Sequence, residues 1–377
     1  MDMVTFAGLQ RHPTPDRDRT MIGAAMKHRF RAVGGALLLT AGLLTACGED
    51  AGSSGTDAGK PVVGVDYPRS DTDFWNSFIK YTPQFATESG VELKTTNSQN
   101  DVAKLTANVQ TFISQGVKGV AMAPQDTAAI APTLQTLAGK KIPVVTIDTR
   151  PDTGEVFMVV RADNRAYGEK ACQFLGTKLS GKGKVVMLQG GLDSINGRDR
   201  TEAFNDCMKK NYPGITVFGE ATNWDGAVAS QKLQTRLTQH PDIKGVYMEA
   251  SFALSGTLQV LRQRNLLVKP DDAKHVWIVS NDGIPEELKN ISEGLIDATV
   301  SQPADLYAKF SVAYLKDAIA GKKYQPGPTD HDSTIIEVRP GVLEDQLAAP
   351  LVTADGGTYG GVQSIKPDDK SLWGNNL

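Results

Sequence analysis

The sequence contains little of the chemistry that enzymes and metal sites depend on. It has only five His and three Cys among 377 residues. His240, His275 and His331 are scattered, and no His-x-x-x-His or Cys-x-x-Cys pair is present. No Gly-x-Ser-x-Gly occurs, and the Gly-Lys-Gly-Lys run at 181–184 precedes an expected strand, whereas a phosphate loop would follow one. The sequence therefore predicts no enzyme, no metal site and no cofactor.

An excess of charge of one sign and a long hydrophobic run are lacking as well. The 40 Lys and Arg nearly balance the 43 Asp and Glu, for a net charge of -3, so no basic surface for nucleic acid is expected. The apolar run at 32–44 is too short to span a bilayer as a folded helix. The composition, 40% hydrophobic and 22% charged, is typical of globular proteins, and the length fits two domains.

Residues 26–47 resemble the signal peptide of a bacterial lipoprotein. A positive stretch at 26–31 precedes the apolar run, and Leu44-Thr45-Ala46-Cys47 resembles a lipobox. The resemblance implies cleavage before Cys47 and a diacylglycerol on its sulfur, which would anchor the protein to the outer face of the cell membrane. An ordinary secretory signal is the alternative. Residues 1–25 are polar and Arg-rich, so we expect translation to start at Met26, or at Met21, and the leader 1–46 to be removed.

The residues after Cys47 indicate an exported protein on a tether. Residues 47–60 are rich in Gly, Ser and Asp and have no large apolar side chain, which predicts a flexible tether. Cys172 and Cys207 then lie in a compartment that permits disulfides. Each falls on an expected helix beside the first strand of a second lobe, so the two sulfurs form a disulfide or remain separate buried thiols.

From residue 61 the sequence alternates between short apolar strands and helices. The run at 142–147 ends at Asp148, and a similar run at 275–281 ends at Asp282. Continuous apolar runs of this length are typical of strands buried on both faces of a parallel sheet. The short connections predict α/β lobes with doubly wound parallel sheets and right-handed crossovers. The pattern restarts after Asp148 without a Pro/Ser linker, which predicts two lobes joined by crossing strands. Pro83 predicts a kink or break in the first helix.

Polar and aromatic residues recur where these strands end. In parallel α/β sheets ligands bind beyond the carboxyl ends of the strands. Any one such residue could belong to a surface loop, but their recurrence predicts a single crevice. Carboxylates, Arg and Gln suit the hydroxyls of a sugar or polyol, and aromatic faces suit its C–H groups. These residues include Asp71, Phe74, Trp75, the 196–200 and 223–225 segments, Glu249, Asp282 and Gln302.

Residues 61–330 resemble the ribose-binding-protein family, the type I periplasmic sugar-binding proteins of ABC importers. The resemblance rests on the segments 115–120, 142–148, 197–201, 280–283 and 298–302, which occur in the family's order. It implies two lobes joined by a three-segment hinge that close on a ligand and deliver it to a permease. The first lobe is expected to comprise 61–162 plus 303–330, and the second 163–302 plus 331–377. The crossings are expected near 161–163, 302–303 and 329–332.

The resemblance also implies roles for individual positions. Phe74 and Trp75 match the aromatic pair that stacks on the sugar, and Trp224 matches the stacking residue of the second lobe. The polar partners it implies are Asp148, Arg198, Asp282 and Gln302.

Two departures sharpen the expected ligand. Thr149 replaces an arginine and Glu249 an asparagine, so the pocket, together with Asp71, is expected to be acidic and to prefer a ligand rich in donors. We expect an acyclic polyol, or a pentose or hexose other than ribose. An amino sugar is second, and a sugar acid is disfavoured.

Other uses of the same scaffold remain open. A receptor for an amino sugar or signalling ligand that feeds chemosensing is one. A regulator of the lactose-repressor type would need an N-terminal helix-turn-helix where this sequence has an export signal. We expect a monomer whose partners are the sugar or polyol, ABC permease subunits and, through the lipid alone, the membrane. The tail 342–377 is longer than in the ribose binders, and Trp373 predicts that it packs back on the body.

Overall fold

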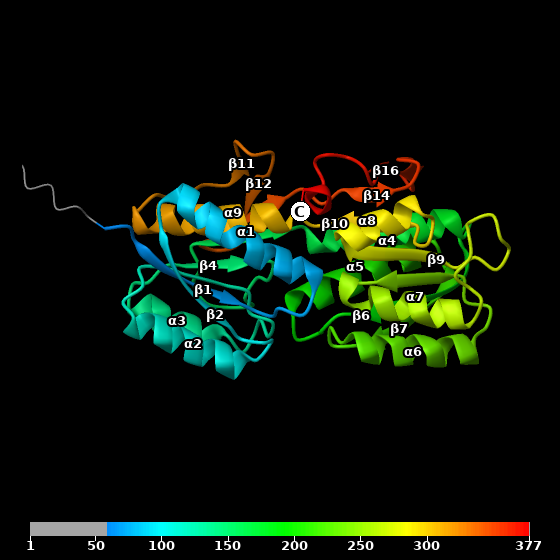
Figure 1. Cartoon of the computed structure of the whole chain (residues 1–377), viewed down its shortest axis with the longest axis horizontal. Coiled ribbons are helices and arrows are strands. Elements are labelled where there is room, and N and C mark those ends of the chain that lie inside the picture. Colours follow the sequence, from blue (N-terminus) through cyan, green and yellow to red (C-terminus); the bar gives the residue numbers. More distant parts are fainter. Residues whose placement is uncertain (1–58, 377) are drawn as a thin grey trace, which may run out of the picture. The chain divides into compact units, whose positions relative to one another are not determined.

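The computed structural model describes residues 59–376, which fold as two α/β lobes (Figure 1). Each lobe is built on an eight-stranded sheet. The predictions for the leader, for Cys47 and for most of the tether lie outside the described residues. No helix within 59–376 has both the length and the apolar character needed to cross a membrane.

The first sheet has the strand order β11-β12-β13-β5-β4-β3-β1-β2, and the run from β13 to β2 is parallel. β1 pairs with both β2 and β3, so the strand order reverses there and leaves a crevice at the carboxyl ends. The strands are β1 (Val62–Tyr67), β2 (Glu92–Asn97), β3 (Val120–Met122), β4 (Val144–Ile147), β5 (Met158–Ala162), β11 (Gly327–Pro328), β12 (Thr334–Arg339) and β13 (Val342–Leu347).

Helices cover both faces of the first sheet (Figure 1). α1 (Asp73–Ser89) and α9 (Ala304–Ile319) pack side by side on one face, and α2 (Val102–Ser114) and α3 (Ala131–Gly139) cover the other. On α2, Leu105, Val109 and Phe112 are buried at helical spacing, as the sequence pattern predicts.

The prediction that Pro83 breaks or kinks the first helix is not supported, because α1 runs unbroken through Pro83 from Asp73 to Ser89. Thr72 begins the helix by accepting a hydrogen bond from the backbone N–H of Trp75. Burial of Phe74 and Phe78 beside α9 stabilises the helix, although Pro83 has no backbone N–H to donate.

The second sheet repeats the design with the order β15-β16-β14-β10-β9-β8-β6-β7. β6 pairs in parallel with both β7 and β8, which gives a second switch point. The strands are β6 (Lys182–Gln189), β7 (Gly214–Ala221), β8 (Gly245–Met248), β9 (Trp277–Asp282), β10 (Ala298–Ser301), β14 (Leu351–Thr353), β15 (Thr358–Tyr359) and β16 (Val362–Ile365). The helices are α4 (Asn164–Lys178), α5 (Ile195–Asn211), α6 (Gly226–Gln239), α7 (Leu254–Gln263) and α8 (Pro285–Ser292), with short 3-10 turns η1 (Ser251–Ala253) and η2 (Trp373–Asn375).

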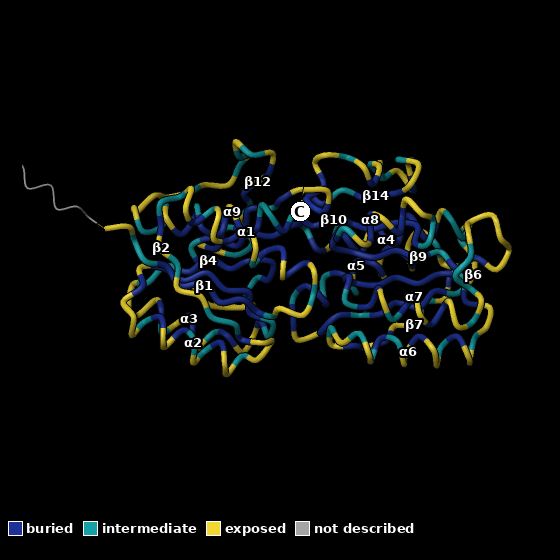
Figure 2. The backbone as a smooth tube through the Cα atoms, in the orientation of Figure 1, coloured by how far each residue is buried: buried dark blue, intermediate teal, exposed yellow. Residues whose placement is uncertain are grey.

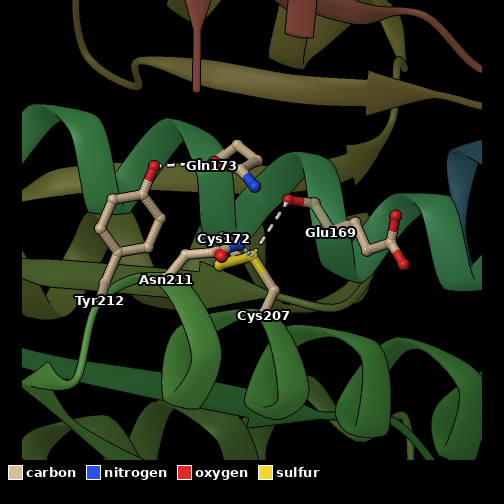
Figure 3. The surroundings of a disulfide bond; sticks show 6 residues. All are labelled: Glu169, Cys172, Gln173, Cys207, Asn211 and Tyr212. Atoms are coloured by element: carbon tan, nitrogen blue, oxygen red, sulfur yellow. Dashed lines mark hydrogen bonds between the residues drawn. A yellow bond between two sulfur atoms is a disulfide. The ribbon is translucent and has the colours of Figure 1, made fainter. Parts of the chain in front are cut away.

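α4 and α5 pack unusually closely and are covalently tied. Cys172 on α4 and Cys207 on α5 form a disulfide, with Cα atoms 6.2 Å apart (Figure 3). One helical turn away, Gly168 allows the helices to approach, because any side chain there would collide with the backbone carbonyl of Arg200. The open choice between a disulfide and separate thiols is thus resolved in favour of the disulfide.

The third crossing between the lobes lies later than expected. β13 pairs with β5 in the first sheet, with Glu344 opposite Val159, so the chain enters the second sheet only between Leu347 and Leu351. The prediction of a crossing near 329–332, and of 331–347 in the second lobe, is wrong. The sequence reasoning took β12 as the last strand and overlooked β13, where Val342 and Leu347 are buried.

Burial follows the two sheets (Figure 2). The central strands, such as β4, β5, β8 and β10, are dark with buried residues, whereas β2, β7 and β12 are largely intermediate or exposed. Exposed residues also line the outer sides of α2, α3 and α6. Trp373 in the tail is 1% exposed, which confirms the expectation that the tail packs on the body.

Candidate functional site

A small cavity lies where strand ends of the two sheets meet. Its volume is ≈ 40 Å³, several times the roughly 10–15 Å³ that one water molecule requires. Its lining residues lie at or beyond the carboxyl ends of strands, as the switch points predict. The first lobe contributes Arg69, Thr72, Phe74, Trp75, Gln125 and Asp148, and the segments after β6 to β10 contribute Asn196, Arg200, Trp224, Ala250, Ser251, Phe252, Asp282 and Gln302.

Most of the residues expected at the crevice line this cavity. They are Phe74, Trp75, Asp148, Trp224, Asp282 and Gln302. Asp71, Thr149, Arg198 and Glu249 do not line it.

Three of these four residues face elsewhere for clear reasons. The side chain of Asp71 is 68% exposed and pairs with Arg69. Thr149 is fully buried after β4, and its hydroxyl donates to the Ile147 carbonyl at 3.5 Å. Glu249 is also buried, and its carboxylate accepts hydrogen bonds from the Thr201 hydroxyl and the Gly190 N–H.

The guanidinium that the second lobe contributes to the cavity belongs to Arg200 instead of Arg198. Arg200 is 2% exposed and donates to Asn164 Oδ1 and to the Glu249 carbonyl. Its guanidinium lies over the rings of Tyr167 and Trp224, at 4.8 and 5.7 Å from the centroids.

Arg198 instead connects the lobes. Its guanidinium donates to Asp152 Oδ1 (2.6 Å) and Thr127 Oγ1 (3.1 Å) in the first lobe. It also donates to the carbonyls of Leu192 and Asp193 in its own lobe. Arg198 therefore bridges the two lobes outside the cavity.

The two cavity carboxylates sit on unusual backbone. Asp148 has φ 62° and Asp282 has φ 116°, both in the left-handed half of the map, where non-glycine residues are strained. In each case the turn carries the side chain out of the sheet at the point where the strand ends.

Burial shifts the protonation of both carboxylates. It raises the pKa of Asp148 to about 6, although the charges of Arg200 and Arg161 act in the opposite direction. Burial also raises the pKa of Asp282, against the charge of Arg200. The Asp282 carboxylate accepts hydrogen bonds from the Ser251 N–H and hydroxyl and from Gln302 Nε2.

The aromatic walls are held by close packing. Trp224, at φ 60°, rests on Gly190, where an added Cβ would overlap the indole. Phe74 meets Trp75 edge to face, with ring centroids 5.1 Å apart. A flat or C–H-rich ligand face thus finds aromatic surfaces from both lobes.

Two buried polar atoms of the cavity residues have no hydrogen-bond partner within 59–376. They are Asp148 Oδ1, an acceptor, and Trp224 Nε1, a donor. Buried polar atoms are nearly always paired in folded proteins, so these two call for a ligand with both donors and acceptors.

The charges that line the cavity balance. The lining residues include two positive side chains, Arg69 and Arg200, and two negative ones, Asp148 and Asp282. Glu249 faces other partners, and Asp71, which does not line the cavity, pairs with Arg69. The expected acidic pocket is therefore not found, because the sequence reasoning counted Glu249 and Asp71 in and left Arg69 and Arg200 out.

Comparison with known proteins identifies the family to which this chain belongs. The family described as "Periplasmic binding protein domain" matches residues 63–323. The chain belongs to the type I periplasmic sugar-binding proteins.

Individual relatives agree with this assignment. Ribose import binding protein RbsB of Bacillus subtilis is 27% identical over 300 residues, which cover 78% of this chain and 95% of that protein. The xylitol-binding protein of Mycolicibacterium smegmatis is 25% identical, covering 81% of this chain and 82% of that protein. The fold matches an ABC transporter solute-binding protein from Burkholderia graminis in complex with D-arabinose, with a TM-score of 0.69 at 22% identity, over 80% of this chain and 97% of that one.

The sequence reasoning missed several cavity residues of this periplasmic binding protein, and one of them carried a readable signal. Arg200 shares a face of α5 with Asn196, Ala203, Phe204 and Cys207, all buried. Helical periodicity therefore points Arg200 inward and Arg198 away. Arg69 and Gln125 lie in connections, and Ser251 and Phe252 lie in the short 3-10 turn η1, where no such pattern can be read.

Proposed function

We propose that this protein is an exported solute-binding protein that captures a small neutral sugar or polyol between its lobes and delivers it to an ABC permease. The observation that carries the proposal is the pair of unpartnered atoms, Asp148 Oδ1 and Trp224 Nε1, in a cavity of balanced charge. A hydroxyl group both donates and accepts, so a polyhydroxy compound can satisfy both atoms without adding charge.

The ligand contacts follow from the lining residues. Asp148 and Asp282 accept hydrogen bonds from hydroxyl groups, and Arg200 and Gln302 donate hydrogen bonds to them. Phe74, as well as Trp75 and Trp224, covers the C–H faces of the ligand. Hydrogen bonds to charged groups contribute about 1.5–3 kcal/mol each, enough to discriminate between stereoisomers once water is excluded.

The relatives support the ligand class. The names of two relatives specify ribose and xylitol, a pentose and an alditol, and a matching structure holds D-arabinose. We therefore propose a pentose or a small alditol that binds as the lobes close, in a protein anchored outside the membrane by a lipid on Cys47.

Calorimetry of the body from Lys60 onward against pentoses, hexoses, alditols, amino sugars and sugar acids tests the ligand class. We expect binding of a neutral pentose or alditol. Trp224→Ala and Asp282→Ala should each weaken it at least about 100-fold, since each removes a buried contact. The control Asp242→Ala changes an exposed Asp that pairs with Lys184 in the same lobe and should bind normally.

Two results would contradict the proposal. Tight binding of a sugar acid would refute the balanced-charge argument, and full affinity in both cavity variants would refute the placement of the site. Independently, Cys47→Ser should release the full-length protein from the membrane fraction, and continued membrane association would refute the anchor.

A further inference from the structure

The C-terminal segment 366–376 follows the last strand, β16, and has a structure held by its own hydrogen bonds. Asp369 Oδ1 accepts hydrogen bonds from the backbone N–H and the hydroxyl of Ser371, at 2.8 and 2.7 Å. Asn375 Nδ2 donates to the carbonyls of Pro367 and Asp369. These local bonds fold the segment into a compact turn that ends in η2 and buries Leu372 and Trp373 almost completely.

Trp373 contacts the backbone of Asp282, one of the two cavity carboxylates. The indole Nε1 donates to the Asp282 carbonyl at 3.0 Å. The next residue, Gly374, lies so close to the Gly283 carbonyl that any side chain there would collide with it. Asp282 (φ 116°) and Gly283 (φ 73°) form the strained exit from β9, so the tail holds the backbone at the point that aims the Asp282 carboxylate.

The same indole also contacts a cavity residue of the other lobe. Its ring lies edge to face against Phe74, with centroids 6.1 Å apart. Farther along α1, the Tyr81 hydroxyl donates to the Asn376 carbonyl at 3.2 Å. Trp373 itself does not line the cavity.

We propose that Trp373 is a positioning residue of the binding site. Trp373 lies outside the cavity and holds both the backbone of Asp282 and the ring of Phe74. It thereby links a hydrogen-bonding residue of one lobe to a stacking residue of the other. This inference rests on the proposed function for its affinity readout and on the structure alone for its second readout.

The affinity test uses Trp373→Phe, which keeps an aromatic ring and removes the N–H. The matched control is Trp277→Phe, the same change at a half-buried tryptophan of the second lobe whose ring packs on Phe174 and His275. Trp373→Phe should weaken binding of the pentose or alditol found by calorimetry about 5-fold, as loss of one hydrogen bond of about 1 kcal/mol implies. Trp277→Phe should leave the affinity unchanged.

A double-mutant cycle separates positioning from general stability. In an Asp282→Asn background, Trp373→Phe should cost less than about 2-fold, because the carboxylate it positions is gone. An equal loss in both backgrounds would overturn the proposal.

Hydrogen exchange of the ligand-free protein gives a readout that needs no ligand. Trp373→Phe should speed amide exchange in 280–285 and 72–78 relative to Trp277→Phe. Unchanged exchange there would refute the positioning role even if no sugar binds, whereas faster exchange without any ligand binding would refute the proposed function alone. Trp373→Ala, if it folds, should show larger effects of the same sign.

Discussion

The bridge formed by Arg198 should contribute to ligand affinity without touching the ligand. Its guanidinium reaches Asp152 and Thr127 in the opposite lobe and does not line the cavity. If the lobes close on the ligand as proposed, each bond made only between the lobes stabilises the bound state. Arg198→Ala removes these bonds and leaves the cavity wall intact.

The size of the effect follows from exposure. The side chains of Arg198 and Asp152 are 29% and 32% exposed. An ion pair in that setting contributes about 0.2–1 kcal/mol, and the bond to Thr127 adds about 0.5–1 kcal/mol. A total near 1–1.5 kcal/mol corresponds to about 5- to 10-fold weaker binding. Because the contact forms on closure, the change should appear mainly in the dissociation rate and should shrink in high salt.

Stopped-flow fluorescence and calorimetry measure this effect, and Arg165→Ala is the matched control. Arg165 is an exposed arginine that pairs with Glu202 and Asp206 within its own lobe, so its loss should not alter binding. Asp152→Asn combined with Arg198→Ala should bind little more weakly than Arg198→Ala alone, because the single change already removes the ion pair. A loss above about 100-fold that is independent of Asp152 would show that Arg198 contacts the ligand, and the reasoning would fail.

Three further predictions concern the cavity and the core. Gly190→Ala should push the Trp224 indole into the cavity and weaken binding at least about 10-fold, since overpacking costs about 1–3 kcal/mol, whereas Gly139→Ala, which has open space, should bind normally in the same calorimetric assay. Because burial raises the pKa of Asp148 to about 6, the free energy of unfolding should fall by up to about 3 kcal/mol as the pH rises from about 4 to about 6 and should then level off, and urea titrations of Asp148→Asn should not show this decrease. Ligand affinity should change in the opposite sense and fall below about pH 6, because hydroxyls donate to the ionised carboxylate. Reduction of the disulfide, which spans 35 residues, should cost about 4 kcal/mol and lower the melting temperature, and an unchanged melting temperature would contradict that estimate.

Local sequence patterns were sufficient to predict the sheets and much of the cavity. Apolar runs that stop at Asp148 and Asp282 indicate strands buried in a parallel sheet. In such a sheet the carboxyl ends of the strands lie along the same edge, where ligands bind. The crevice residues that line the cavity end a strand, lie in the connection after it or begin the next helix.

Most of the failures have a different cause, which is tertiary context. Arg200 is the exception, because the helical periodicity of α5 already favours it over Arg198, and the contact with α4 at Gly168 fixes the same rotation of the helix. In contrast, β13 contains three consecutive polar residues, Glu344, Asp345 and Gln346, and only its pairing with β5 assigns it to the first sheet. Side-chain partners such as those of Glu249 depend on packing that sequence spacing does not encode.

The late crossing at 348–350 has a consequence for how the protein is made. The first sheet needs β13, and its outer helix layer needs α9, yet both follow the entire second-lobe segment that ends at Ser301. During synthesis the first lobe therefore cannot complete its sheet until almost the whole polypeptide has left the ribosome. A chain of this connectivity completes its fold late. While it is still unfolded, it can pass through a secretion channel.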